Sequence, residues 1–286
     1  MRIMKRLFKS TIANILIVKL VFIVFGTLLA GIGFVSILDD LENPFQQADS
    51  REEAEIQQIK ATNDLGEQVR RYRALIVRVG PLEAQEALLR SGLPFDGQTH
   101  LLNHTAGDYL FETYGVSGLS QCKEYFLASC YHGFILRAIG AGETSKIDEV
   151  VAECKKGGIR IMTQCSHAIG HGFLVLVGYA RLPEALKLCD QVGARTAEFP
   201  LYSCHDGVFM ENVWGVHEGK PSPDRWVNPQ DIVYPCNDPV IEEQYRNACW
   251  SNQPMYMYQL FAGDARKVGE QCLQVENDTY QKTCFD

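Results

Sequence analysis

The sequence lacks the short motifs that mark the common catalytic and redox centres. It contains no Cys-x-x-Cys and no Cys-x-x-Cys-His, which argues against a thioredoxin-like centre and against covalently attached haem. The Gly-x-Ser-x-Gly, phosphate-loop and dinucleotide-binding patterns are also absent. The sequence therefore gives no support to a serine hydrolase or a nucleotide-binding enzyme.

Positive charge is scarce outside the N-terminus. The first 38 residues hold five basic residues and no acid, so residues 39–286 carry a net charge of −13 against −8 for the whole chain. Binding to nucleic acid depends on neutralising phosphates with Lys and Arg. The acidic part of the chain is therefore predicted not to bind nucleic acid.

A run of 19 uncharged residues, 20–38, follows the basic N-terminus. At 1.5 Å per residue it could cross a hydrocarbon core of about 30 Å, and the preceding basic residues predict a cytoplasmic N-terminus. A cleaved signal peptide is the alternative, but its apolar region is usually ~7–15 residues and ends at a small-x-small site, which residues 34–38 do not offer. The prediction is a single-pass membrane protein with residues 1–38 as cytoplasmic tip and transmembrane signal anchor. Its C-terminal domain would be extracytoplasmic, either periplasmic or extracellular.

No cysteine precedes Cys122, and the ten that follow fall into five successive pairs. An even number of cysteines outside the cytoplasm indicates a disulfide framework. Cys122/Cys130 is the weakest pair, because the sulfurs would lie ~12 Å apart if one helix ran through both residues. The predicted pairs are Cys122/Cys130, Cys154/Cys165, Cys189/Cys204, Cys236/Cys249 and Cys272/Cys284.

Helical patterns cover most of the remaining chain. After a polar linker at 39–50, a capping box at Ser50 opens a helix predicted over 51–79, and further helices are predicted over 81–89 and 99–114. The cysteine pairs then recur about every 35 residues, which is typical of a helical hairpin. The first helix of each unit is expected to end at its first cysteine, and the second helix to begin near its second cysteine. The expected domains are a helical part at 51–117 and cysteine-paired repeats at 118–286 with a proline-rich insertion at 219–239.

This layout resembles helical-hairpin repeat proteins of the tetratricopeptide class. The Cys-x-His-Gly and His-x-x-x-His-Gly patterns are similar to those of uncharacterised bacterial exported proteins. The resemblance implies a helical-hairpin repeat layout. Together with the uncharged run and the cysteine pairs, it leads to the predicted fold class: an all-α protein in which an N-terminal transmembrane helix precedes a disulfide-stapled, α-solenoid-like repeat domain. The resemblance implies no particular activity.

Six of the seven histidines occur in repeated contexts. Two pairs are spaced i,i+4, which places both imidazoles of a pair on one face of a helix. If successive hairpins stack, the six side chains would line one groove and could bind Zn²⁺, Cu²⁺ or Fe²⁺, with Asp108, Asp206 or Glu211 as carboxylate partners. The predicted ligands are His100, His104, His132, His167, His171 and His205.

Two classes of function fit this pattern. One is a binding or assembly scaffold that uses its concave face or the proline-rich loop to hold another envelope or cell-surface protein. The other is a metal-binding or metal-dependent protein. Neither histidine pair has the glutamate of a zincin, because Leu101 and Ala168 occupy that position, so Glu211 is the candidate catalytic base. A purely structural role is the alternative for the histidines, since a histidine beside a glycine often only bonds a loop carbonyl.

Overall fold

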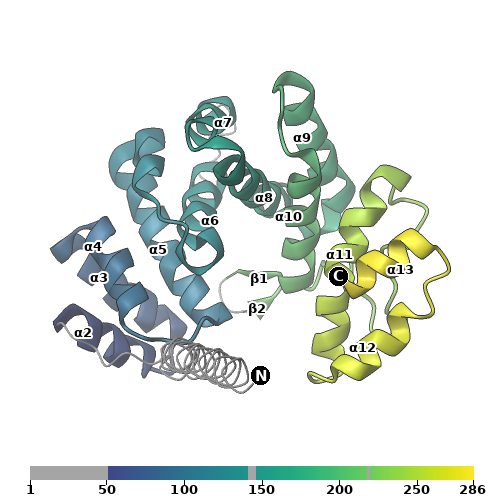
Figure 1. The fold of residues 1–286 in the computed structure, drawn as a ribbon, viewed down its shortest axis with the longest axis horizontal. Coiled ribbons are helices and arrows are strands. Elements are labelled where there is room, and N and C mark those ends of the chain that lie inside the picture. Colours follow the sequence, from purple (N-terminus) through teal and green to yellow (C-terminus); the bar gives the residue numbers. More distant parts are fainter. Residues whose placement is uncertain (1–50, 141–145, 218–219) are drawn as a thin grey trace, which may run out of the picture.

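Helices make up almost all of the secondary structure in the computed structural model, which describes residues 51–140, 146–217 and 220–286. They follow one another in chain order along an arch (Figure 1). The only strands in the described residues are β1 (Val216–His217) and β2 (Lys220–Pro221), which form one antiparallel ladder. The helices are α2 (Arg51–Lys60), α3 (Leu65–Val79), α4 (Pro81–Arg90), α5 (Gly97–Tyr114), η1 (Gly115–Gln121), α6 (Tyr125–Gly140), α7 (Ile147–Lys156), α8 (Gly158–Val177), η3 (Tyr179–Arg181), α9 (Leu182–Arg195), α10 (Leu201–Trp214), α11 (Glu243–Leu260), α12 (Ala265–Cys272) and α13 (Asp278–Phe285). The predicted all-α, repeat-like fold is confirmed.

Five helices form the inner row of the arch, in the order α5, α6, α8, α10 and α11, and each packs on the next. Their apolar faces meet in one continuous core that includes the fully buried rings of Phe134, Phe173 and Phe209. The ring of Phe111 meets that of Phe134 edge to face, with centroids 5.3 Å apart. This geometry is the favoured one for aromatic pairs, and it joins α5 to α6.

Glycines let two pairs of inner helices meet backbone to backbone. A Cβ on Gly133 of α6 would lie 2.0 Å from the carbonyl oxygen of His104 on α5, and one on Gly207 of α10 would lie 2.0 Å from that of His167 on α8. The contacts are reciprocal, because Gly107 faces the carbonyl of Cys130 in the same way. Any side chain at these positions would push the helices apart.

The five cysteine pairs expected from the sequence are confirmed as disulfides, and none of the ten cysteines is free. Their Cα atoms lie 5.4 to 6.3 Å apart, which is within the range that a disulfide spans. The bridges are Cys122–Cys130, Cys154–Cys165, Cys189–Cys204, Cys236–Cys249 and Cys272–Cys284.

The doubtful pair, Cys122–Cys130, closes because one helix does not run through it. Its Cα atoms are 5.4 Å apart. Phe126, Leu127 and Ala128 have left-handed φ angles of 52°, 57° and 56°. Residues other than glycine rarely adopt this conformation, and the turn lets the chain fold back to form the bridge.

Several helix ends differ from the sequence prediction. The segment 51–79 is two helices, because the side chain of Asp64 accepts the amide of Glu67 and starts α3 afresh. α7 and α9 continue past Cys154 and Cys189, whereas α12 does end at its cysteine. The first cysteine of a pair therefore does not fix where its helix ends.

The expectation that the second helix begins near the second cysteine is wrong in three of the units, because Cys165, Cys249 and Cys284 lie well past the starts of α8, α11 and α13. α8 begins at Gly158, which has a left-handed φ of 77°, so Cys165 lies well inside that helix. α11 begins at Glu243, and Cys249 likewise lies inside it. A bridge requires only that two helix faces come close, with Cα atoms 6.3 Å apart for Cys154–Cys165 and 5.5 Å for Cys236–Cys249. Helix starts are set instead by local backbone features, such as the break at Gly158.

The predicted membrane location is contradicted by the described part of the chain. None of the helices there is long and apolar enough to cross a membrane. Even α8, with 20 residues, carries Arg160 and two histidines. The segment on which the prediction depended, residues 20–38, lies outside the described residues. The disulfides are compatible with an extracytoplasmic location.

The proline-rich insertion between α10 and α11 is tied to the arch. Asn212 on α10 donates to the carbonyl oxygen of Trp226 and accepts from its amide, both at 2.8 Å. The ring of Trp226 stacks on that of Tyr234, and its Nε1 donates to the carbonyl of Ala180. These contacts hold the insertion beside η3.

Candidate metal centre

Five of the six predicted histidines meet in one cluster, formed by α5, α6 and α8. Neighbouring rings have centroids 4.8 Å apart for His100–His104, 5.1 Å for His100–His132, 5.4 Å for His132–His167 and 4.7 Å for His167–His171. The i,i+4 pairs of α5 and α8 each face α6, which lies between them and supplies His132. We call His100, His104, His132, His167 and His171 the histidine cluster.

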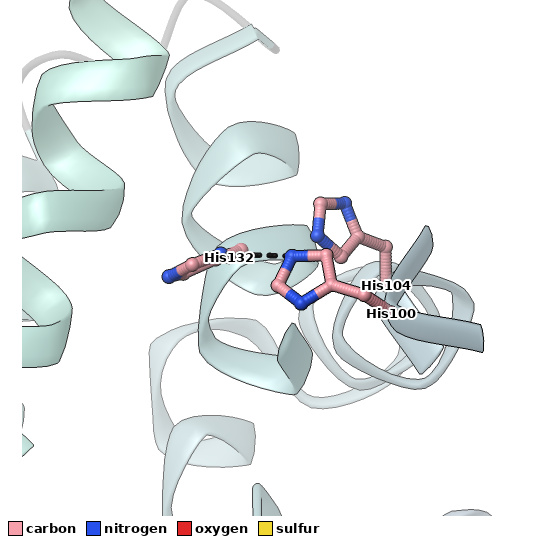
Figure 2. Close-up of side chains that lie close together, drawn as sticks. All are labelled: His100, His104 and His132. Atoms are coloured by element: carbon pink, nitrogen blue, oxygen red, sulfur yellow. Dashed lines mark hydrogen bonds between the residues drawn. The ribbon is translucent and has the colours of Figure 1, made fainter. Parts of the chain in front are cut away.

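The first half of the cluster joins α5 to α6. Ligand atoms of His100, His104 and His132 all lie within 4.8 Å of one another (Figure 2). The Nδ1–H of His100 donates to the carbonyl of Phe126 at 2.7 Å, which leaves its Nε2 as an acceptor. That Nε2 lies 3.2 Å from Nδ1 of His132. The left-handed turn at Phe126 thus sets the tautomer of His100.

The second half of the cluster lies on α8. The Nδ1 of His167 lies 3.1 Å from Oδ2 of Asp206, and the Nδ1 of His171 lies 2.8 Å from Oε2 of Glu211. The two Nε2 atoms face each other at 3.0 Å. Because an ionised carboxylate only accepts hydrogen bonds, each Nδ1 carries a proton, and in the neutral form of each ring Nε2 then presents a lone pair. The two lone pairs therefore point at each other.

The carboxylates are held in place from the far side. Asp206 accepts from Ser251 at 3.0 Å and from Asn252 at 2.7 Å, both on α11. Burial alone would raise the pKa of Asp206, but the hydrogen bonds from His167, Ser251 and Asn252 bring its pKa below the ordinary value. Glu211 accepts from the hydroxyl of Tyr179, whose own pKa is raised by burial and by Glu211. Carboxylates that orient histidines in this way are typical of the surroundings of metal ligands.

Burial favours the neutral form of three rings of the cluster, those of His100, His132 and His171. It lowers the pKa of His132 well below its usual value, and the neighbouring histidines lower it further. Burial also lowers the pKa of His171, although Glu211 acts in the opposite direction, and it lowers that of His100 despite the Phe126 carbonyl. Neutral imidazoles are the form that binds metal.

His205 does not join the cluster. Its Nε2 lies 2.9 Å from Asp190, and its ring packs edge-on against that of Tyr245 at 4.8 Å. Successive residues of a helix point about 100° apart. Because Asp206 faces α8, its neighbour His205 faces α9 and α11. The structure thus brings together five of the six histidines named from the sequence and places His205 apart from them.

Two of the three candidate carboxylates contact the cluster, and the third does not. Asp108 pairs instead with Arg73 at 2.9 Å and with Arg137 at 3.4 Å. Glu211, the candidate catalytic base, is buried and bonded to His171 and Tyr179, so it is placed to position His171. The roles of the Phe126 carbonyl and of Tyr179 were not predicted from the sequence, because no motif surrounds either residue.

Comparison with known proteins adds no relative from which to transfer a role. No family model, characterised protein or solved structure matches the chain. The histidine cluster is therefore interpreted from its own contacts and charges.

Replacing His132 with leucine should reduce the acid sensitivity of the metal-free protein. The pKa of His132 is lower in the folded chain than its unfolded value of about 6.5. Its contribution to stability is therefore present above pH ~6.5 and is lost as the pH falls, by up to about 1.4 kcal/mol per unit. Urea unfolding at pH 7.5 and 5.5 measures this. Equal losses in the parent and His132→Leu would contradict it.

Proposed function

We propose that the chain is a metal-binding protein whose histidine cluster holds a transition-metal ion. The observation that carries the proposal is the pair of facing Nε2 atoms of His167 and His171, 3.0 Å apart, with both Nδ1 atoms on carboxylates. Two lone pairs at this distance repel each other, and a cation between them turns the repulsion into attraction. Two nitrogens of a tetrahedral zinc site, with bonds of about 2.0–2.1 Å, lie ~3.3 Å apart, so a small outward shift of the rings would suffice.

The donor set favours Zn²⁺ or Cu²⁺. All the nitrogens are imidazoles, which suit both ions, whereas Mg²⁺ and Ca²⁺ prefer oxygen. Thiolate ligands are not available, because all ten cysteines are in disulfides. The sequence also makes Fe²⁺ a candidate. Iron sites of this kind commonly combine two histidine ligands with one carboxylate ligand. Here the carboxylates of Asp206 and Glu211 each contact Nδ1 of a histidine. They are therefore occupied in orienting ligands, and the site lacks the carboxylate ligand that Fe²⁺ prefers. The scaffold function stays a prediction.

The double change His167→Ala, His171→Ala should remove the proposed metal site. Changing a residue that only orients a metal ligand typically costs 10–100-fold in affinity, so losing two ligands should weaken Zn²⁺ binding by at least about 100-fold. Glu211→Gln should give an intermediate loss of about 10–100-fold. Equilibrium dialysis with Zn²⁺, followed by elemental analysis, measures both effects.

His205→Ala is the matched control for that experiment. His205 lies on α10 next to Asp206, but its ring points away from the cluster to Asp190. This variant should bind as much Zn²⁺ as the parent. A parent protein that retains no metal after loading, or an equal loss in the His205 variant, would contradict the proposal.

A further inference from the structure

We propose that the histidine cluster holds two metal ions and that His132 bridges them as an imidazolate. This inference rests on the proposed metal-binding function and goes beyond it in the number of ions and in the role of His132. The five rings differ in the hydrogen-bond partners of their two nitrogens.

In three of the rings, one nitrogen has an outer hydrogen-bond partner and the other faces the cluster, as in an ordinary metal-binding histidine. His100 gives Nδ1 to a backbone carbonyl, and His167 and His171 give Nδ1 to carboxylates. In each case Nε2 is left for the centre. A ligating histidine of an ordinary single-metal site has such an outer partner, which fixes its tautomer.

His132 has no such outer partner among the described residues. Its Nδ1 lies 3.2 Å from Nε2 of His100, and its Nε2 is buried with no hydrogen-bond partner. His132 is only 6% exposed, so water does not readily take the place of the missing partner. Leaving a buried nitrogen unpaired costs ~1–3 kcal/mol, which calls for a reason.

The ring of His132 lies between the two halves of the cluster. Figure 2 shows Nδ1 turned to His100 and the other nitrogen pointing away from both His100 and His104. α6 lies between α5 and α8, and the His132 ring packs against those of His167 and His171 with centroids 5.4 and 5.5 Å away. One nitrogen of the ring therefore contacts an imidazole of α5, and the ring as a whole packs against two imidazoles of α8.

Each half then supplies three nitrogens to one ion. The first site would take Nε2 of His100, one ring nitrogen of His104 and Nδ1 of His132, which together form the compact group on α5 and α6. The second would take Nε2 of His132 with the facing Nε2 atoms of His167 and His171. Three histidines with one open position form a common arrangement for Zn²⁺ and Cu²⁺.

The charges and protons balance without any redox step. Neutral His132 binds the first ion through one nitrogen and keeps one N–H. When the second ion binds the other nitrogen, that N–H bond breaks and the proton leaves to solvent. The resulting imidazolate carries one negative charge. Together with Asp206 and Glu211 it offsets part of the charge of two divalent ions. His100, His104 and His167 keep part of their surface exposed, so ions can reach both halves.

Copper titration followed by electron paramagnetic resonance tests the bridge. The protein is loaded with Cu²⁺, freed of loose ions by gel filtration and measured frozen. Two equivalents should bind, and the signal should fall nearly to zero at the second equivalent, because an imidazolate couples the two unpaired electrons. Protein loaded with one Cu²⁺ and one Zn²⁺ should instead keep the full signal of one copper.

Two variants keep the outcome interpretable. His132→Ala should lose the coupling, and His104→Ala, which leaves the ring of His132 intact, should bind one uncoupled Cu²⁺; circular dichroism checks that both remain helical. Two uncoupled ions in the parent would overturn the bridge. One ion would overturn the two-metal centre while leaving the proposed function standing, and no bound copper or zinc would overturn both.

Discussion

Alanine at Gly133 is expected to destabilise the protein by about 3 kcal/mol or more, because overpacking against a backbone cannot be relieved by a side-chain rotation. The new Cβ would lie 2.0 Å from the carbonyl oxygen of His104 and 2.6 Å from its Cα. Relief requires α5 and α6 to separate, which also moves His132 away from His100. Urea unfolding should show the loss, and Zn²⁺ affinity should fall with it.

Gly140→Ala is the matched control on the same helix. A Cβ there meets no atom of the described residues within 4 Å, and alanine is the better helix former. Its stability should therefore equal or slightly exceed that of the parent. If Gly133→Ala proved as stable as Gly140→Ala, the close crossing of α5 and α6 would be wrong.

The double change Cys189→Ala, Cys204→Ala is expected to cost about 3 kcal/mol by releasing a loop of this length in the unfolded chain. The two residues are 15 apart in sequence and join α9 to α10. α10 also carries Asp206 and Glu211, so loosening its start should weaken Zn²⁺ binding as well. Chemical unfolding and equilibrium dialysis measure the two effects.

The change Cys272→Ala, Cys284→Ala separates these effects. These two cysteines are 12 residues apart in sequence and join α12 to α13 at the C-terminal end of the arch (Figure 1). It should cost a comparable free energy of unfolding but leave Zn²⁺ affinity unchanged. Equal losses of affinity in both double variants would show that the metal depends on global stability alone.

The sequence was most informative where the signal is local. Successive cysteines at short separations predicted all five bridges, and Gly80-Pro81 predicted the boundary between α3 and α4. The i,i+4 histidine pairs likewise placed two imidazoles on one face of α5 and of α8. In each case neighbouring residues alone decide the geometry.

The same cysteines were poor guides to helix ends. Cys165 and Cys249 were expected near the starts of their helices, but both lie inside them. A cysteine has to be on the helix face that meets its partner, and every turn of a helix returns a residue to that face. The spacing of two cysteines therefore predicts which helices are joined, and not where along a helix the bridge attaches.

Other features depended on contacts between distant segments. The left-handed turn at Phe126–Ala128 occurs in a sequence of ordinary helix formers, so only the bridge and the packing around it account for it. Whether His205 or Asp206 faces α8 depends on the rotation of α10 about its own axis. That rotation is set where Gly207 meets the backbone of His167, a contact between residues 40 apart. No spacing rule contains this information.

The close helix crossings also explain why imidazoles of α5 reach that of α6, and why carboxylates of α10 reach the imidazoles of α8. Gly107 and Gly133 bring α5 onto α6, and Gly170 and Gly207 bring α10 onto α8. At each of the four positions one methyl group is missing, and the neighbouring main chain occupies its place. An imidazole reaches only a few ångströms from its own helix, so an ordinary helix spacing would hold these rings apart. The histidine cluster and the two carboxylates beside it thus owe their short distances as much to four atoms that the chain does not carry as to the side chains that it does.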